Sequence, residues 1–160
     1  MAAEVKVRKM TDADLARVNE IDQLLYGEER LPTWPFSFES YWGIHNPKLS
    51  FVAVLDGEIV GFIVGNIVQE EHSQSTVRLS HSPGPQPKNQ RIAWMDMIGI
   101  HPDYQRRGIG QALIEAFFEQ CRTSNVPARG LVREGDEQLE KFMKSLGFHQ
   151  QEYVIYERDC

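Results

Sequence analysis

The richest chemistry in the sequence lies in one stretch, residues 98–114, where a strand is expected to lead through a turn into a helix. The N–H groups in the first turn of a helix lack partners within the helix and carry the positive end of its dipole. Gly108 and Gly110 let a ligand approach the backbone closely, and Arg106 and Arg107 add two positive charges. Together these features predict a cradle for a pyrophosphate group. The alternative is an ordinary strand-to-helix turn with surface arginines.

Because the chain has a negative net charge, an anionic ligand needs a local group of positive charges and N–H donors. Seventeen Lys and Arg residues stand against twenty-three Asp and Glu residues, which gives a formal net charge of −6 at pH 7. Nucleic-acid binders usually carry a basic face, so no nucleic-acid partner is expected. The sequence contains neither GxxxxGK followed by Ser or Thr nor a full GxGxxG, so P-loop and dinucleotide-binding interpretations lose their main support.

Length and composition predict one domain over residues 1–160 in a reducing, cytoplasmic setting. The two cysteines, Cys121 and Cys160, form no CxxC motif, and Cys121 falls on an apolar helix face where a core position is expected. No apolar run approaches the roughly 20 residues that a membrane-spanning helix needs, so no membrane partner is expected. The five histidines have no metal-ligand spacing, so no metal site is expected either.

Hydrophobic periodicity predicts an α/β domain with the element order β-α-α-β-β-β-α-β-α-β. Helix starts are indicated by Thr11-x-x-Asp14 and by Asp136, and a hairpin by Asp56-Gly57. Residues 71–90 are polar and rich in proline, which is typical of either a mobile lid or a tolerated surface insertion. The expected elements are a strand at 4–9, helices at 15–25 and 38–42, strands at 50–55, 58–68 and 92–100, a helix at 108–122, a strand at 131–132, a helix at 136–146 and a strand at 153–156.

Three short segments together resemble one enzyme family. Residues 105–110 read Gln-Arg-Arg-Gly-Ile-Gly between a strand and an amphipathic helix, residues 146–148 read Leu-Gly-Phe after a helix, and residues 56–61 read Asp-Gly-Glu-Ile-Val-Gly at a hairpin. The first segment is similar to the coenzyme A motif Gln/Arg-x-x-Gly-x-Gly/Ala of the GNAT N-acetyltransferase superfamily. The resemblance covers essentially the whole chain, and it implies a GNAT-like mixed central β-sheet flanked by helices in a single domain.

This resemblance implies an acetyl-CoA-dependent N-acetyltransferase in which a primary amine attacks the thioester directly. The amine would belong to a small molecule or to a protein or peptide N-terminus, and homodimers are common in the family. The pantetheine arm would lie along the end of the central strand, and the pyrophosphate would lie on the amides of the glycine loop. The implied cofactor-binding residues are Ile98, Gly99, Ile100, Gln105, Arg106, Arg107, Gly108, Ile109, Gly110 and Gln111.

The chain departs from the family at the residue that protonates the leaving thiolate. Many members place a tyrosine four residues before the glycine of Leu-Gly-Phe, whereas this chain has Met143, which has no proton to donate. Members that acetylate ribosomal-protein N-termini tend to carry a glutamate where this chain has Leu131. These differences leave open a second function, a catalytically impaired CoA-binding regulatory or sensor module. A partner-binding protein without CoA would leave the Arg-Gly loop unexplained.

Asp96 and Tyr153 are the substitute catalytic candidates. Asp96 lies four residues before Ile100 in the central strand, and strict alternation would place it on the same face as Ile98 and Ile100. Many relatives carry an acidic residue there that contacts the acceptor amine; the alternative is a carboxylate satisfied by a neighbouring strand. Tyr153 alternates with Tyr156 on the last strand and is a candidate acid, with simple packing as the alternative.

An unusual density of aromatic residues in the first third of the chain suggests an acceptor surface. Aromatic walls with nearby glutamates would suit a cationic amine. The alternative is that the aromatics are core residues and the acids are solvated. The aromatic residues concerned are Tyr26, Trp34, Phe36, Phe38, Tyr41 and Trp42.

Overall fold

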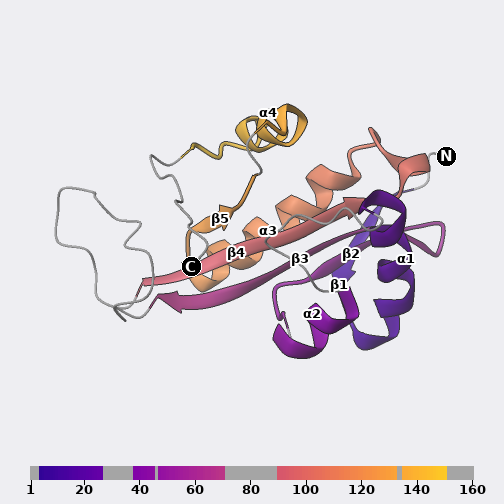
Figure 1. Cartoon of the computed structure of the whole chain (residues 1–160), viewed down its shortest axis with the longest axis horizontal. Coiled ribbons are helices and arrows are strands. Elements are labelled where there is room, and N and C mark those ends of the chain that lie inside the picture. The colour runs from indigo at the N-terminus through magenta and orange to yellow at the C-terminus, as the bar shows by residue number, and fades with distance from the viewer. Residues whose placement is uncertain (1–3, 27–37, 46, 71–89, 133–134, 151–160) are drawn as a thin grey trace, which may run out of the picture. The chain divides into compact units, whose positions relative to one another are not determined.

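The computed structural model divides into two compact units, and each is described by itself (Figure 1). The first unit contains residues 1–70 and 90–131, and the second contains residues 71–89 and 132–160. The structure describes residues 4–26, 38–45, 47–70, 90–132 and 135–150.

The first unit is built on a five-stranded sheet in the order β1-β2-β3-β4-β5. Neighbours from β1 to β4 are antiparallel, whereas β5 runs parallel to β4, so the sheet is mixed as the sequence predicts. The β2–β3 hairpin turns through Asp56 and Gly57, which both have positive φ, as a two-residue turn of this kind requires. The strands are β1 (Lys6–Lys9), β2 (Phe51–Leu55), β3 (Glu58–Glu70), β4 (Gln90–Ile100) and β5 (Ala128–Gly130).

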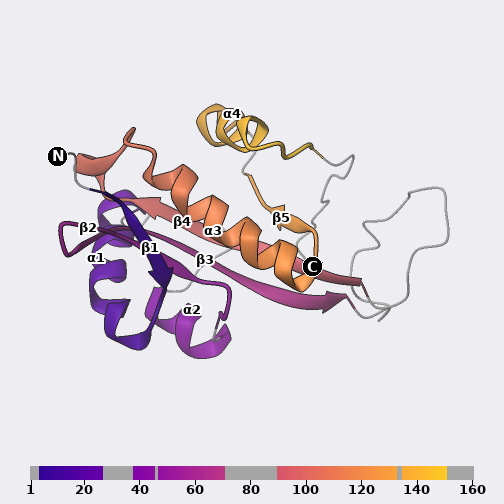
Figure 2. The ribbon, with the colours of Figure 1, turned by 180° about the vertical axis from the view of Figure 1, so that it is seen from behind.

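Helices cover both faces of this sheet: α1 (Leu15–Tyr26) and α2 (Phe38–His45) lie on one, and α3 (Ile109–Ser124) lies on the other (Figures 1 and 2). Alternate residues of β3 divide between the two sides, as they must in a strand. Phe62 belongs to the cluster that packs against α1 and α2, whereas a Cβ atom on Gly65 would lie 2.7 Å from Phe117 of α3.

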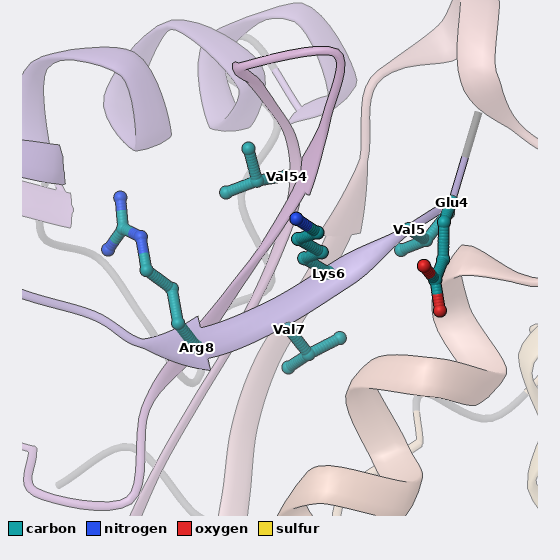
Figure 3. A pocket seen from close by; sticks show the side chains of 6 residues that line it. All are labelled: Glu4, Val5, Lys6, Val7, Arg8 and Val54. Atoms are coloured by element: carbon teal, nitrogen blue, oxygen red, sulfur yellow. The ribbon is translucent and has the colours of Figure 1, made fainter.

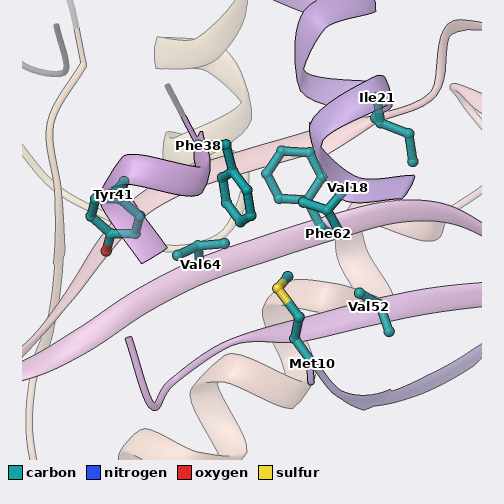
Figure 4. Close-up of a cluster of buried hydrophobic side chains, with 8 residues drawn as sticks. All are labelled: Met10, Val18, Ile21, Phe38, Tyr41, Val52, Phe62 and Val64. Carbon is teal, nitrogen blue, oxygen red and sulfur yellow. The ribbon is translucent and has the colours of Figure 1, made fainter. Parts of the chain in front are cut away.

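The core on the α1 and α2 side is a cluster of buried side chains from both helices, from β2 and β3, and from Met10 after β1 (Figure 4). Phe38 and Tyr41 of α2 are both within it, and their side chains are almost completely buried. For these two aromatics the core interpretation is therefore correct, and neither forms an open wall for an acceptor. The cluster consists of Met10, Val18, Ile21, Phe38, Tyr41, Val52, Phe62 and Val64.

A β-bulge interrupts the pairing of β3 with β4. Val64 pairs with Met97 and Gly65 pairs with Met95, which leaves Asp96 as the extra residue on β4. A Cβ atom on Gly65 would overlap the carbonyl oxygen of Trp94, so glycine is needed for the strands to approach here. The bulge changes which face of the sheet Asp96 contacts, because an extra residue breaks the alternation of the strand.

An ion pair fixes the corner between β1 and α1. Arg8 donates two hydrogen bonds of 2.8 Å to the two carboxylate oxygens of Asp14, and the Thr11 amide donates a third, also of 2.8 Å. The bonds from Arg8 contribute most to lowering the pKa of Asp14 to about 2, against the opposing effect of burial. The capping box predicted at Thr11-x-x-Asp14 is thus confirmed, with a short 3-10 turn preceding α1.

Replacing Asp14 by asparagine should lower the free energy of unfolding by about 1–2 kcal/mol at neutral pH. The pKa of Asp14 in the folded protein, about 2, lies below its ordinary value of 3.8. The stabilisation is therefore complete above about pH 4 and is lost as the pH falls through about 2. Urea denaturation at a series of pH values measures both effects.

The control for this prediction is Glu20→Gln, which removes the partner of Arg17 in an exposed ion pair. It should change the free energy of unfolding by less than about 0.5 kcal/mol, because exposed pairs contribute little. An Asp14→Asn effect that persisted undiminished in strongly acidic solution would contradict the ion-pair explanation.

The second unit contains α4 (Glu137–Ser145). Asp136 caps this helix by accepting a hydrogen bond of 3.0 Å from the Leu139 amide, and Gly147 follows its end with φ of +84°. The predicted helix and both of its end signals are therefore confirmed. Of the loop predicted at residues 71–90, Gln90 is the first residue of β4, and residues 71–89 lie outside the described residues. The strand expected at residues 153–156 also lies outside them.

The strand predicted at residues 131–132 is misplaced. The structure puts β5 at Ala128–Gly130, and Leu131 follows the strand with 56% of its surface exposed. The apolar residue types at 131–132 suggested a buried strand, but parallel pairing with residues 93–95 of β4 determines which residues join the sheet.

Candidate active site

The candidate site begins where β5 stops pairing with β4. The described ladder between these strands runs only from Ala93↔Ala128 to Met95↔Gly130. β4 continues to Ile100 and remains paired with β3 along its other edge. Residues 98–100, expected from the sequence to contact pantetheine, therefore lie beyond the last described pair with β5.

Contacts with β3 and within the turn itself hold the segment that follows β4. The His101 amide donates a 2.9 Å hydrogen bond to the Val60 carbonyl, and His101 Nδ1 accepts from the Asp103 amide. Arg107 donates to the Asp103 carbonyl at 3.1 Å, and its guanidinium lies 5.2 Å from the centre of the Tyr104 ring. These contacts hold the chain that leads into α3. Gln105 also donates a 3.3 Å hydrogen bond to the Ile100 carbonyl.

The loop has the backbone geometry that the predicted cradle requires. Arg106 and Gly108 have φ of +61° and +76°, and α3 starts at the next residue, Ile109. The first bond within the helix joins the Ala112 amide to the Gly108 carbonyl at 3.0 Å. The preceding amides, up to Gln111, lack acceptors inside the helix, and Gly108 has no side chain to cap them. A Cβ atom on Gly108 would meet nothing within 4 Å, so the space beside Gly108 is open.

The inner face of α3 holds this N-terminus in place. Its buried side chains recur at helical spacing and pack against the sheet. Cys121 is one of them, and burial raises the pKa of its thiol to about 11, so it is a core residue as expected. The buried residues are Ile109, Leu113, Ile114, Phe117 and Cys121.

Asp96 makes a short contact with a residue that is distant in sequence. The Tyr41 hydroxyl donates a 2.5 Å hydrogen bond to Asp96 Oδ2. Burial, together with the neighbouring carboxylate, raises the pKa of Tyr41 well above its ordinary value, so the hydroxyl remains a neutral donor. Because Tyr41 belongs to the core on the α1 and α2 side, Asp96 contacts that side of the sheet.

The face predicted for Asp96 is therefore wrong. Strict alternation would place Asp96 with Ile100, but a Cβ atom on Gly61 would contact both Ile100 and Ile109 of α3, which puts Ile100 on the α3 face. The bulge at Asp96 explains the difference. The partner that the structure describes for this carboxylate, Tyr41, is a residue of helix α2.

Comparison with known proteins now settles the family. Residues 15–148 match the model of the acetyltransferase (GNAT) family. The chain belongs to this family. The match spans parts of both compact units, and the five-stranded mixed sheet with flanking helices is the architecture that the resemblance implied.

Solved structures share the fold of this GNAT protein. The aminoglycoside N-acetyltransferase AAC(6')-Iy, in complex with CoA, is 20% identical, with 99% of this chain and 97% of that chain covered and a TM-score of 0.70. An aminoglycoside acetyltransferase from an uncultured soil metagenomic sample, in complex with sisomicin, is 19% identical, with coverages of 98% and 95% and a TM-score of 0.66. Ard1 from Thermoplasma volcanium is 23% identical, with coverages of 91% and 82% and a TM-score of 0.63.

The remaining candidate site residues of this acetyltransferase lie in one or the other compact unit, or outside the described residues. Met143 lies in α4 and is buried, with 6% of its surface exposed. Trp42 is partly buried, and its indole N–H donates a 2.9 Å hydrogen bond to Asp12. The candidate acid Tyr153 lies outside the described residues, as do the Trp34 and Phe36 residues of the expected aromatic surface.

One open hollow, of about 630 Å³, lies along β1 (Figure 3). It is separate from the candidate site, because β1 is the edge strand of the sheet opposite to β5. It is lined by Glu4, Val5, Lys6, Val7, Arg8 and Val54. Among the described residues, no helix is long and apolar enough to span a membrane, and no His, Cys, Asp and Glu side chains cluster in a group that could hold a metal ion.

The contact of Tyr41 with Asp96 is the feature of the candidate site that the sequence did not predict. The sequence marks it only as one of several aromatics, because it lies 55 residues from Asp96 and no local pattern links the two. The available signal was its helical spacing from Phe38, which places both rings on one face of a short helix and predicts that Tyr41 is buried. A buried tyrosine hydroxyl usually has a hydrogen-bond partner.

Proposed function

We propose that this chain is an acetyl-CoA-dependent N-acetyltransferase whose acceptor is a primary amine of a small molecule or of a protein or peptide N-terminus. The observation that carries the proposal is the open cradle at Gly108, which directly follows the part of β4 beyond its described pairing with β5. When bound, acetyl-CoA supplies an activated acetyl thioester that the amine attacks directly. All other contributions come from the residues of the chain.

The cofactor-binding residues have two tasks. The amides of Ile109, Gly110 and Gln111, with the positive charges of Arg106 and Arg107, bind the pyrophosphate. The backbone of residues 98–100 offers strand-like hydrogen bonds to the pantetheine arm. One of these amides stabilises the negative charge that develops on the thioester oxygen, an effect of several kcal/mol in comparable sites.

Two opposite sides of the sheet contribute to the site in this proposal. The cradle belongs to α3, which covers one face, while Asp96 contacts Tyr41 on the face covered by α1 and α2. Acetyl-CoA therefore approaches β4 from the α3 side, and the acceptor amine approaches from the side of Asp96. This separation lets the two substrates meet at the bulge without competing for space.

Among amines that are cationic at pH 7, those with a lower pKa lose their proton at a smaller cost in free energy. Deprotonating a lysine-like amine at pH 7 costs about 4–5 kcal/mol, whereas an α-amino group costs about 1 kcal/mol. Asp96 contacts the acceptor, and Tyr153 is the candidate acid for the leaving thiolate. Among the neighbours, AAC(6')-Iy was also solved with a CoA-linked acetylneamine analogue, so an aminoglycoside belongs in any acceptor panel for this chain.

A CoA-binding regulatory or sensor module is the second candidate function. Met143 supports it, because a buried thioether stands where many relatives have a tyrosine and it cannot protonate a thiolate. Calorimetric binding of acetyl-CoA without thiol release across alkylamines, aminoglycosides and peptide N-termini would favour this candidate. Turnover of a single amine would exclude it, and absence of acetyl-CoA binding would overturn both proposals.

Replacing Asp96 by asparagine should reduce kcat/KM for the amine about 100-fold, because the acceptor loses the charged partner near the reacting centre. The affinity for acetyl-CoA should stay within about twofold, since the cradle belongs to α3. Thiol release measures the first quantity, and calorimetry measures the second. Asp56→Asn is the matched control, because it makes the same change at an exposed hairpin turn, where asparagine tolerates the φ of +51°. Equal kcat/KM values for Asp96→Asn and Asp56→Asn would show that Asp96 does not contact the acceptor.

A further inference from the structure

Three features of the structure coincide at Asp96. The last described pair between β4 and β5 is at the preceding residue, Met95. The bulge opposite Val64 and Gly65 makes Asp96 the extra residue of the strand. Its carboxylate accepts the 2.5 Å hydrogen bond from Tyr41. A partly exposed carboxylate is thus held where β4 leaves its described pairing with β5.

The position of the Tyr41 hydroxyl is set by the core. Only 1% of the Tyr41 surface is exposed, and its ring centre lies 6.4 Å from that of Phe38. Figure 4 shows the ring at one end of the buried cluster, with its oxygen turned away from the other labelled side chains. A hydroxyl anchored by such a packed ring cannot move without disturbing the cluster.

We propose that Tyr41 is a positioning residue that holds the Asp96 carboxylate in place and keeps it ionised, so that Asp96 binds the acceptor as an ammonium ion. This assignment rests on the proposed function. It names the acceptor class as cationic primary amines and gives Asp96 the role of an electrostatic anchor. The proton of the ammonium then leaves to water and not to Asp96.

The direction of the effect follows from the chemistry of a donated hydrogen bond. A donor to the charged form of a carboxylate stabilises that form and makes the carboxylate a weaker base. Ordinary amines have pKa values about 4–6 units above that of an aspartate, so proton transfer to Asp96 is already unfavourable. A neutral donor such as Tyr41 increases this mismatch while leaving the negative charge of Asp96 available for an ion pair.

The direct test is the titration of Asp96 itself, followed by the carbon resonance of its carboxyl group. Tyr41→Phe should raise the pKa of Asp96 by about one unit, because the carboxylate loses a hydrogen bond while the ring remains. Following one resonance separates Asp96 from the ionisable groups on the elements packed against β4. These include Arg17 and Asp22 on α1, Cys121 on α3 and Arg129 on β5.

Trp42→Phe is the matched control for this titration. It removes another hydrogen bond from an α2 side chain to an aspartate, that of Trp42 to Asp12, and should leave the pKa of Asp96 unchanged. In the unaltered protein, the Cζ resonance of Tyr41 should also titrate with the midpoint of Asp96, so the test survives if Tyr41→Phe does not fold. An unchanged pKa in Tyr41→Phe, or independent midpoints, would overturn the positioning role.

The anchor role has a separate kinetic test with acetyl-CoA and two small amines. Propylamine is a cation near neutral pH, whereas trifluoroethylamine is largely uncharged. Tyr41→Phe should raise KM for propylamine about fivefold, with kcat changed less, and should leave trifluoroethylamine unaffected. Loss of kcat at constant KM, or equal effects on both amines, would overturn the anchor. Failure of acetyl-CoA to bind would instead refute the proposed function, while the titration still decides whether Tyr41 positions Asp96.

Discussion

Replacing Gly108 by valine should weaken acetyl-CoA binding about 100-fold or more, which corresponds to about 2.7 kcal/mol. Two physical effects add in this variant. Gly108 has φ of +76°, a left-handed conformation that is strained for any residue with a Cβ and most strained for a β-branched one. The new side chain would also occupy the open space beside Gly108, in the loop where the pyrophosphate is expected to bind. Calorimetric titration with acetyl-CoA measures the loss.

The chain offers a matched control in Gly57. This glycine has φ of +86° at the β2–β3 turn, and a Cβ there would also meet nothing within 4 Å. Gly57→Val therefore adds the same strain at a turn outside the loop that leads into α3, and it should lower thermal stability without changing acetyl-CoA affinity. If the two variants lost affinity equally, the effect would be general destabilisation, and the cradle would not be the binding site.

Replacing Gly65 by alanine should have the largest effect on folding, a loss of about 3 kcal/mol or more in the free energy of unfolding. Even one methyl group at this position would overlap the Trp94 carbonyl oxygen and approach Phe117 to 2.7 Å. Backbone and a buried ring cannot both move aside cheaply in a packed core. Urea denaturation should show the loss, and the melting temperature should fall by about 6–12 °C.

Gly65→Ala should also reduce acetyl transfer at temperatures where the variant remains folded. The clash lies at the bulge that sets the position of Asp96, so relief of the clash displaces the carboxylate. Gly43→Ala is the control, because Gly43 is exposed in α2 and a Cβ there meets nothing. It should stabilise the protein by up to about 1 kcal/mol through helix propensity. A neutral Gly65→Ala would show that the strands separate easily at the bulge.

The parts of the site that could be predicted from sequence are those determined by near neighbours along the chain. A helix N-terminus, a glycine with positive φ and adjacent arginines lie within a few residues of one another, so the local sequence is enough to predict the cradle at Gly108. The same holds for the hairpin at Asp56-Gly57 and the cap at Asp136. Each depends on hydrogen bonds and backbone conformations within one turn.

The face of the sheet that Asp96 contacts could not be predicted from the sequence, because it depends on the pairing between strands. Period-2 alternation is reliable only while two strands remain in register, and a single extra residue at Asp96 reverses the expected face. The prediction of a strand at residues 131–132 was wrong for a related reason, because residues 128–130 are the ones that pair with β4.

The sequence by itself therefore determined the family, the order of the elements through α4 and the glycine turn that leads into α3, because these rest on local motifs, periodicity, caps and glycine conformations. Only the tertiary structure decided that Phe38 and Tyr41 are core residues and that Tyr41 meets Asp96 across 55 residues of chain. Such contacts form only when a helix packs on a sheet with a particular register. No pattern along the chain encodes that register, because it depends on the combined packing of both faces and on the bulge between β3 and β4.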